Sequence, residues 1–312
     1  MAIMTTGLFP SMFYTGLANL KLAYGMEEPR WPSEYTQYYN VGTMDAAFIN
    51  HLLYAGPGHP TEVQELEDLP LVSLRETYTK RFDTRKYGFR LQFSQETVEE
   101  VDKRIRIFSD SGRGLRRQMD IHDEILGVDL LENGDTGTAA EYLVADGQNI
   151  FDASHPIGEG AVMTDSNLLT AATLAITSLQ TLNDAVEQTA DDNGDLMMLR
   201  MERLFIHQAQ QYTAMRLLAQ LETDPESAER AAHPLKAVAP QTIILRYLLT
   251  SGAYYGDTSY ASSEQGWNWL WMRPLQIQED INIINESAYV TASKKLARGV
   301  SDWRGRVKVP AV

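Results

Sequence analysis

The stretch that decides the fold is residues 87–126, which read YGFRLQFSQETVEEVDKRIRIFSDSGRGLRRQMDIHDEIL. At its start, aromatic or aliphatic residues alternate with polar ones, and this period of two predicts a β-strand. From a capping box at Thr97 and Glu100, apolar residues recur every three or four positions and predict one long helix. The helix should end near Asn133 and Gly134. At about 1.5 Å per residue it would be a rod of roughly 50 Å and would act as a spine.

A weaker alternation precedes this strand, from Val72 to Phe82. The polar residues Asp83 to Lys86 lie between the two alternating stretches and predict a turn. We therefore expect the two strands to pair as a long hairpin. Because a two-stranded hairpin is marginal alone in water, this one should be supported by a neighbouring surface.

Residues 1–62 are rich in aromatic side chains but are interrupted by proline and glycine. Apart from short helices expected at 14–24 and 44–54, they show no sustained period, so their rings must find burial elsewhere. Two interpretations stay open. The segment is either an arm that lies on other parts of an assembly or an irregular layer on the chain's own core.

The remainder of the chain mixes helices and strands. A second helix is predicted from Ser166 to Val186, and a third over 207–221. The third helix is expected to face inward through Tyr212, Met215 and Leu218. Strands are predicted at 141–151, 196–206, 241–250, 267–283 and 288–298. Because no regular βαβ repeat emerges, the fold class is α+β.

Composition narrows the function. The chain has no cysteine, which removes disulfides and thiolate chemistry, and it has no apolar run long enough to span a bilayer. Its net charge of −15 would repel phosphate backbones. These totals argue against a sequence-reading DNA-binding protein, although a protein that merely surrounds DNA can carry such a charge.

Candidate chemistry is sparse. His122 has acidic neighbours, but they do not share its helix face. Residues 191–195 begin like a calcium loop, yet Leu196 stands where the glycine should be. Ser154 and His155 are adjacent and point in different directions. We predict no catalytic, cofactor-binding or metal-binding residue and no enzymatic activity; a soluble hydrolase or metalloenzyme using His122 or His155 is the distant alternative.

A local basic cluster stands out in this acidic chain. It is read either as a solvated face paired with nearby acids or as an inner patch facing packaged DNA or an acidic scaffold. Its members are Lys103, Arg104, Arg106, Arg113, Arg116 and Arg117.

Four short motifs follow one another in a fixed order from residue 150 to the C-terminal region. They are IFDASHP at 150–156, Ser166-Asn167, Asn193-Gly194 and Asp302-Trp303-Arg304-Gly305. With the hairpin and spine, this order resembles the major capsid proteins of tailed phages, in the fold named after the Hong Kong 97 phage, and is most similar to the Mu-like major head subunits. The resemblance covers about residue 70 to the C-terminus.

The resemblance implies a division of the chain. Its parts are an N-terminal arm (1–62), an E-loop hairpin (63–97), the spine helix (98–134), peripheral-domain strands and a loop (135–165), a mainly axial domain (166–287) and a C-terminal peripheral-domain strand (288–312). Intersubunit contacts would be made by E-loop residues Tyr78, Phe82, Tyr87 and Phe89 and by arm residues Phe9, Phe13, Tyr14 and Trp31.

The implied function is a structural head protein without a cofactor. Copies would form pentamers and hexamers, and these an icosahedral shell around double-stranded DNA that is not read by sequence. The implied partners are portal, scaffold and decoration proteins, with no membrane, and the location is the virion after assembly in the bacterial cytoplasm. The alternative within the same fold is an encapsulin-type compartment that encloses cargo enzymes.

Overall fold

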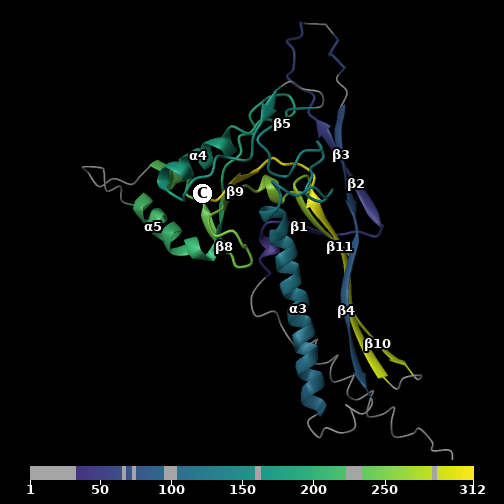
Figure 1. Cartoon of the computed structure of the whole chain (residues 1–312). Helices are drawn as coiled ribbons and strands as arrows, with labels where there is room; N and C mark the ends of the chain where they lie inside the picture. The colour runs from purple at the N-terminus through teal and green to yellow at the C-terminus, as the bar shows by residue number, and fades with distance from the viewer. Residues whose placement is uncertain are drawn as a thin grey trace, which may run out of the picture.

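Figure 1 shows the computed structural model of the chain. The structure describes residues 33–64, 68–71, 75–94, 104–158, 163–222, 234–282 and 287–312. One long helix and several long strands extend from a body made of a second sheet and shorter helices (Figure 1). This mixture confirms the α+β class.

The larger sheet has the strand order β1-β10-β11-β4. β1 is parallel to β10, and the other neighbours are antiparallel. The bounds are Asn40–Thr43 for β1, Trp267–Asn282 for β10, Ser287–Val300 for β11 and Arg85–Ser94 for β4. The strands predicted at 267–283 and 288–298 are thus confirmed. Both faces of β10 are covered at its start, since Trp267 and Trp269 on one face and Asn268 and Leu270 on the other are all buried.

The predicted spine is confirmed as α3, Arg104–Glu132. Its expected start at Thr97 lies outside the described residues. Leu115 and Met119, four positions apart, are both buried, as the apolar stripe requires.

The predicted hairpin partner is wrong. β3, Arg75–Asp83, pairs with β2, Phe48–Ala55, whereas β4 pairs with β11. Only Thr84 separates β3 from β4, and one residue is too short a link to reverse the chain direction. The chain therefore continues from the β2–β3 sheet into the larger sheet. β2 lies where a helix over 44–54 was expected. The hairpin is therefore β2–β3, closed through residues 56–74, rather than a hairpin within 63–97.

A second sheet forms the other half of the body, with the order β12-β9-β7-β8. Its strands are Arg306–Val309, Tyr254–Asp257, Arg203–His207 and Gln241–Leu245. The strands predicted at 196–206 and 241–250 are confirmed in shortened form. Residues 141–151 hold only an isolated bridge between Leu143 and Asn149 instead of strands, because the segment turns at Gly147.

Two helices accompany this sheet on the side away from β2 and β3 (Figure 1). The second predicted helix begins ten residues late: α4 is Ile176–Glu187, because Leu168 pairs instead with Lys308 in extended conformation. The third is confirmed as a 3₁₀ turn, Gln208–Gln210, followed by α5, Gln211–Glu222. Its inward face was predicted wrongly. Tyr212 and Met215 are exposed, and the buried positions are Ala214, Leu217 and Leu221.

Short elements complete the described chain. They are 3₁₀ turns at Tyr35–Gln37, Pro234–Val238 and Tyr260–Ser262, and the two-residue strands β5, His155–Pro156, and β6, Thr164–Asp165. No helix in the described ranges is both long enough and apolar enough to cross a bilayer.

Part of the segment interpreted as an arm belongs to the chain's own core. Tyr38 and Tyr39 are buried, Tyr39 packs edge-on against Trp267, and β1 joins the larger sheet. For residues 33–43 the structure thus favours the second interpretation, a layer on the chain's own core, whereas β2 pairs only with β3 among the described strands. Residues 1–32 lie outside the described residues.

Candidate functional site: a buried motif network and an exposed hairpin face

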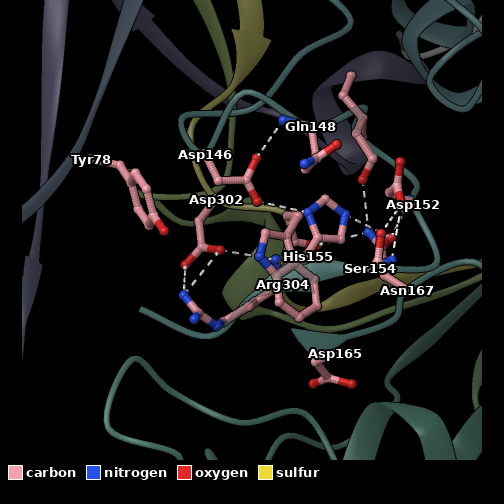
Figure 2. Close-up of polar contacts among 12 residues, drawn as sticks. Tyr78, Asp146, Gln148, Asp152, Ser154, His155, Asp165, Asn167, Asp302 and Arg304 are labelled. Carbon is pink, nitrogen blue, oxygen red and sulfur yellow. Dashed lines mark hydrogen bonds and ion pairs between the residues drawn. The ribbon is translucent and has the colours of Figure 1, made fainter. Parts of the chain in front are cut away.

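His155 is the centre of a buried polar network (Figure 2). Its Nδ1 lies 2.8 Å from Asp146 Oδ2, and its Nε2 lies 3.2 Å from Asn167 Oδ1. The imidazole also stacks on the indole of Trp303. Because both ring nitrogens are engaged and one ring face is covered, the contacts fix the position of His155.

Asn167 joins three separate segments. Its Nδ2 donates to the carbonyl of Ile150 at 2.7 Å and to that of Trp303 at 3.3 Å, while its Oδ1 accepts from the backbone N–H of Asp152 at 2.9 Å. The motifs quoted from the sequence at 150–156, 166–167 and 302–305 thus meet at one place. The sequence showed their order, and the structure shows that they form one joint.

Arg304 connects this joint to the turn at 191–194. It is buried, its Nε donates to the carbonyl of Ala190 at 2.7 Å, and its Nη2 lies 2.6 Å from Asp192 Oδ1. Its Nη1 lies 3.3 Å from Asp302 Oδ2 (Figure 2). Burial opposes the charge, but the two carboxylates outweigh it and raise the pKa of Arg304 above its ordinary value. Arg304 thus binds the residues directly before the fourth motif, Asn193-Gly194.

The residues considered for catalysis make other contacts. Ser154 Oγ donates a hydrogen bond to Asp152 Oδ1 at 3.1 Å rather than to His155. His122 packs against Tyr87, and burial together with the charges of Lys294 and Arg298 lowers its pKa to about 4. Nearby cations disfavour a bound metal ion. Among the described residues, no three His, Asp or Glu side chains are grouped to hold a metal.

Two buried ion pairs fix the spine to the larger sheet. Lys294 Nζ lies 2.6 Å from Asp123 Oδ1, and Arg298 Nη2 lies 2.5 Å from Asp129 Oδ2. Burial raises the pKa of Asp123 to about 6 against the opposing effect of Lys294. Removing one member of such a pair leaves the other charge buried without compensation.

Glu124 of the spine holds the segment that enters the body before β1. Its two carboxylate oxygens accept from the backbone N–H groups of Glu34 and Tyr35, at 2.9 and 3.1 Å. Burial raises the pKa of Glu124 to about 7. Glu124 thus fixes the backbone of Glu34 and Tyr35 next to the spine.

One face of the β2–β3 hairpin carries exposed apolar side chains together with exposed polar ones such as Asn50 and Asp83. Phe48, Leu52 and Tyr54 lie on the same face of β2, and they are 46%, 43% and 50% exposed. On the same face, the guanidinium of Arg81 lies 4.2 Å from the ring centre of Phe48. On the opposite face, Leu53 and Ala55 are buried, whereas Ile49 is 36% exposed. Within the described residues, the chain thus covers most of the inner side of the hairpin and leaves Phe48, Leu52 and Tyr54 exposed.

The residues that the sequence predicted as E-loop contacts differ from Phe48, Leu52 and Tyr54. Phe82 is only 1% exposed and packs with Met44, Leu270 and Ala297, so its prediction as an intersubunit contact is wrong. Tyr87 packs against the main core, and Tyr78 donates to the carbonyl of Gly158 at 3.0 Å. Phe89 is 37% exposed and stays a candidate contact. Sequence reasoning missed Phe48, Leu52 and Tyr54 because β2 was interpreted as a helix.

Other predicted site residues are only partly described. Phe9, Phe13, Tyr14, Trp31 and Lys103 lie outside the described residues. Arg104, Arg106 and Arg113 lie on α3, but their side chains lie outside the description. Arg116 forms an ion pair with Asp120 at 3.3 Å, and Arg117 is exposed. The pairing of Arg116 fits the solvated-face interpretation for that residue.

Several solved structures from phages are similar to this chain in fold. The capsid of cyanophage P-SCSP1u matches with a TM-score of 0.55 at 10% identity, over 92% of this chain and 90% of that one. A structure from Microbacterium phage Oxtober96 matches with a TM-score of 0.54 at 10% identity, over 92% and 93%. The capsid of Myoviridae phage XM1 matches with a TM-score of 0.50 at 10% identity, over 92% and 94%.

The fold is thus that of a Hong Kong 97-type capsid subunit. No curated protein matches the chain by sequence. A family model described as phage capsid protein matches residues 76–309, and the chain belongs to this family. It is therefore a structural protein of the capsid shell and a component of the virion.

Proposed function

We propose that copies of this chain tile into pentamers and hexamers of an icosahedral shell, in which the β2–β3 hairpin of each subunit lies over a neighbour. The observation that carries the proposal is the group of exposed apolar side chains Phe48, Leu52 and Tyr54 on one face of the hairpin. In a soluble monomer, clustered exposed apolar side chains mark a contact surface.

The energetics favour many modest contacts over one strong contact. At roughly 25 cal/mol per Å², covering a few hundred Å² of the hairpin would contribute several kcal/mol before the cost of ordering the partners. Each subunit makes such a contact and receives one, so a closed shell sums these contributions over all of its subunits. The segment before Glu34, with Phe9, Phe13, Tyr14 and Trp31, is proposed to add a second contact of this kind.

The finer division into domains belongs to the same proposal, with revised bounds. The E-loop is assigned to β2–β3 and its connection, residues 48–83, and the arm to residues that precede Glu34. The spine and the β10–β11–β4 strands form the peripheral domain. The sheet β12-β9-β7-β8 with α4 and α5 forms the axial domain.

The proposed content of the shell is double-stranded DNA held without sequence recognition, which suits a chain of net charge −15. The basic residues of the spine, from Lys103 to Arg117, are proposed to face this DNA or an acidic scaffold. Portal, scaffold and decoration proteins are the proposed partners, and assembly is placed in the host cytoplasm. No catalytic step is proposed, and the Mu-like subfamily stays a prediction.

Electron microscopy of the purified, expressed chain tests the proposal. We expect closed shells with icosahedral symmetry in which β2–β3 of one subunit covers a neighbour. A compact monomer at all concentrations would overturn it. Particles from the native source separate the two kinds of shell: double-stranded DNA with a portal at one vertex supports a phage head, whereas uniform protein cargo supports an encapsulin-type compartment.

A further inference from the structure

A small pocket of about 50 Å³ lies at the base of the β2–β3 hairpin, where β3 passes through Thr84 into β4. Its charged lining is Lys80, Arg81, Asp83, Arg85, Glu141 and Arg298. The lining carries four cations and two carboxylates. It is locally basic in a chain that has 42 acidic and 27 basic residues.

The carboxylates of the lining are already bound to arginines. Glu141 Oε1 lies 2.8 Å from Arg85 Nη1, and Glu141 Oε2 lies 3.3 Å from Arg298 Nη2. Asp83 forms an ion pair with Arg81 at 2.8 Å. No carboxylate among the described residues lies within ion-pair distance of Lys80.

Lys80 is nevertheless buried. Its Nζ donates to the carbonyls of Ala140, at 2.7 Å, and of Leu143. An ammonium group has three N–H donors, so one remains. Burial lowers the pKa of Lys80 to about 8, against the opposing effects of Asp146 and Glu141. The charge is thus held at a cost that an additional anion would offset.

Arg298 also lines the pocket. Its Nε is buried and has no hydrogen-bond partner among the described residues. A buried donor without a partner is costly. The remaining N–H of Lys80 and the four cations of the lining together indicate a missing acceptor.

The size of the cavity limits the acceptor. A single water needs roughly 10–15 Å³ of such volume, so the pocket has room for a carboxylate group but not for a large ligand. Arg81 and Arg85 are both more than half exposed at their side chains and can receive the group from outside. Carboxylates bound by Arg and Lys form the stronger, charge-assisted hydrogen bonds.

We propose that this pocket binds the carboxylate of an Asp or Glu side chain from a neighbouring copy of the chain. The inference rests on the proposed shell function, because it requires copies packed side by side. The chain has more acidic than basic residues, so many Asp and Glu side chains are available to enter the pocket. The pocket also lies at the base of the hairpin that carries the exposed side chains of Phe48, Leu52 and Tyr54. The contact would fix the direction in which the hairpin leaves its own subunit.

The first experiment measures assembly of purified subunits. Lys80→Gln and Arg85→Gln are compared with Arg75→Gln, which removes the same charge from an exposed position on β3 outside the pocket. We expect both pocket variants to need at least about ten-fold more subunit for half-maximal assembly than the control. Equal assembly of all three variants would overturn the proposal. If Lys80→Gln loses the fold, Arg85→Gln, altered at the pocket mouth, still gives the answer.

The second experiment identifies the source of the carboxylate. High-resolution electron microscopy of assembled wild-type particles should show the carboxylate of an Asp or Glu from a neighbouring subunit within hydrogen-bond distance of Lys80 Nζ. Titration of unassembled subunits with acetate and with phosphate tests a free anion instead. Particles with the pocket empty or holding a free anion overturn this inference and leave the shell function intact, whereas failure of the wild-type chain to assemble overturns both.

Discussion

The backbone of Gly305 lies directly against the side chain of Thr258. Gly305 has φ +85°, and a Cβ at this position would lie 2.6 Å from Thr258 Oγ1. The same hydroxyl donates to the carbonyl of Gly305 at 2.9 Å. The glycine of the Asp-Trp-Arg-Gly motif is therefore required both by its left-handed backbone and by its close approach to Thr258, the residue after β9.

Gly305→Ala should destabilise the subunit more than Gly147→Ala. Both positions have a positive φ, +85° and +83°, but no atom lies within 4 Å of a Cβ built at Gly147. The backbone cost, about 1–2 kcal/mol, is common to both variants, and only Gly305→Ala adds the clash. Chemical denaturation of unassembled subunits measures the difference; equal losses would show that the packing against Thr258 does not matter.

Glu124→Gln should flatten the dependence of stability on pH. The folded-state pKa of Glu124, about 7, lies above its ordinary value of 4.5, so the folded chain binds this proton more tightly than the unfolded chain does. The free energy of unfolding should therefore fall as pH rises from about 4.5 to 7, by on the order of 3 kcal/mol from this group. Glu34 and Asp123, whose pKa values are also raised, act in the same direction and remain in the variant.

Denaturation curves at several pH values test this expectation. The quantity to compare is the slope of the free energy of unfolding against pH, between about pH 4.5 and 7. Weaker hydrogen bonds to the backbone of Glu34 and Tyr35 would lower the stability equally at every pH, so they would not change this slope. Glu76→Gln makes the same substitution at an exposed position on β3 and serves as the control. A variant slope identical to that of the wild type would contradict the assignment.

Asp123→Asn should cost about 3–5 kcal/mol, because Lys294 would remain fully buried without its carboxylate. The double variant Asp123→Leu with Lys294→Met should regain much of that loss, since both charges leave the interior together. Urea denaturation of the three proteins gives the two differences. A double variant as unstable as Asp123→Asn would mean that packing volume, and not the stranded charge, sets the loss.

Leu52→Asp should leave the isolated subunit as stable as wild type and should abolish or strongly weaken assembly. Leu52 is 43% exposed, so the folded monomer tolerates a charge there, whereas a neighbour covering the hairpin would bury it. Leu52→Met keeps the apolar surface and is the matched control. Light scattering during assembly and a thermal melt of the free subunit provide the two readouts, and normal assembly of Leu52→Asp would exclude this face as a contact.

Periodicity predicted the elements that carry their own pattern. The long helix and the strands 267–283 and 288–298 were recognisable because Leu115, Met119 and Trp269 recur at the spacing of one buried face. Which strands pair with each other could not be predicted, because alternation indicates that a segment is a strand but does not indicate its partner strand. β4 reads as half of a local hairpin, yet its partner β11 is about 200 residues away, with Phe89 opposite Ala292.

The candidate site shows the same limit. The order of the motifs indicated a family, but only tertiary structure reveals that Asn167 donates to the carbonyl of Trp303. Phe82 was expected outside because it is aromatic and alternates, and its inward direction depends on the register of β3 with β2. Tyr212 was expected inside for a similar reason. Helical spacing groups residues on a face without saying which face the body covers.

The central position of β11 has a consequence for synthesis of the chain. β11 lies between β10 and β4, so β4 has no described strand beside it until residues 287–300 have been made. Until β11 is made, neither β10 nor β4 has its antiparallel partner in the larger sheet. The sheet that packs on the spine is therefore completed by one of the last strands along the chain.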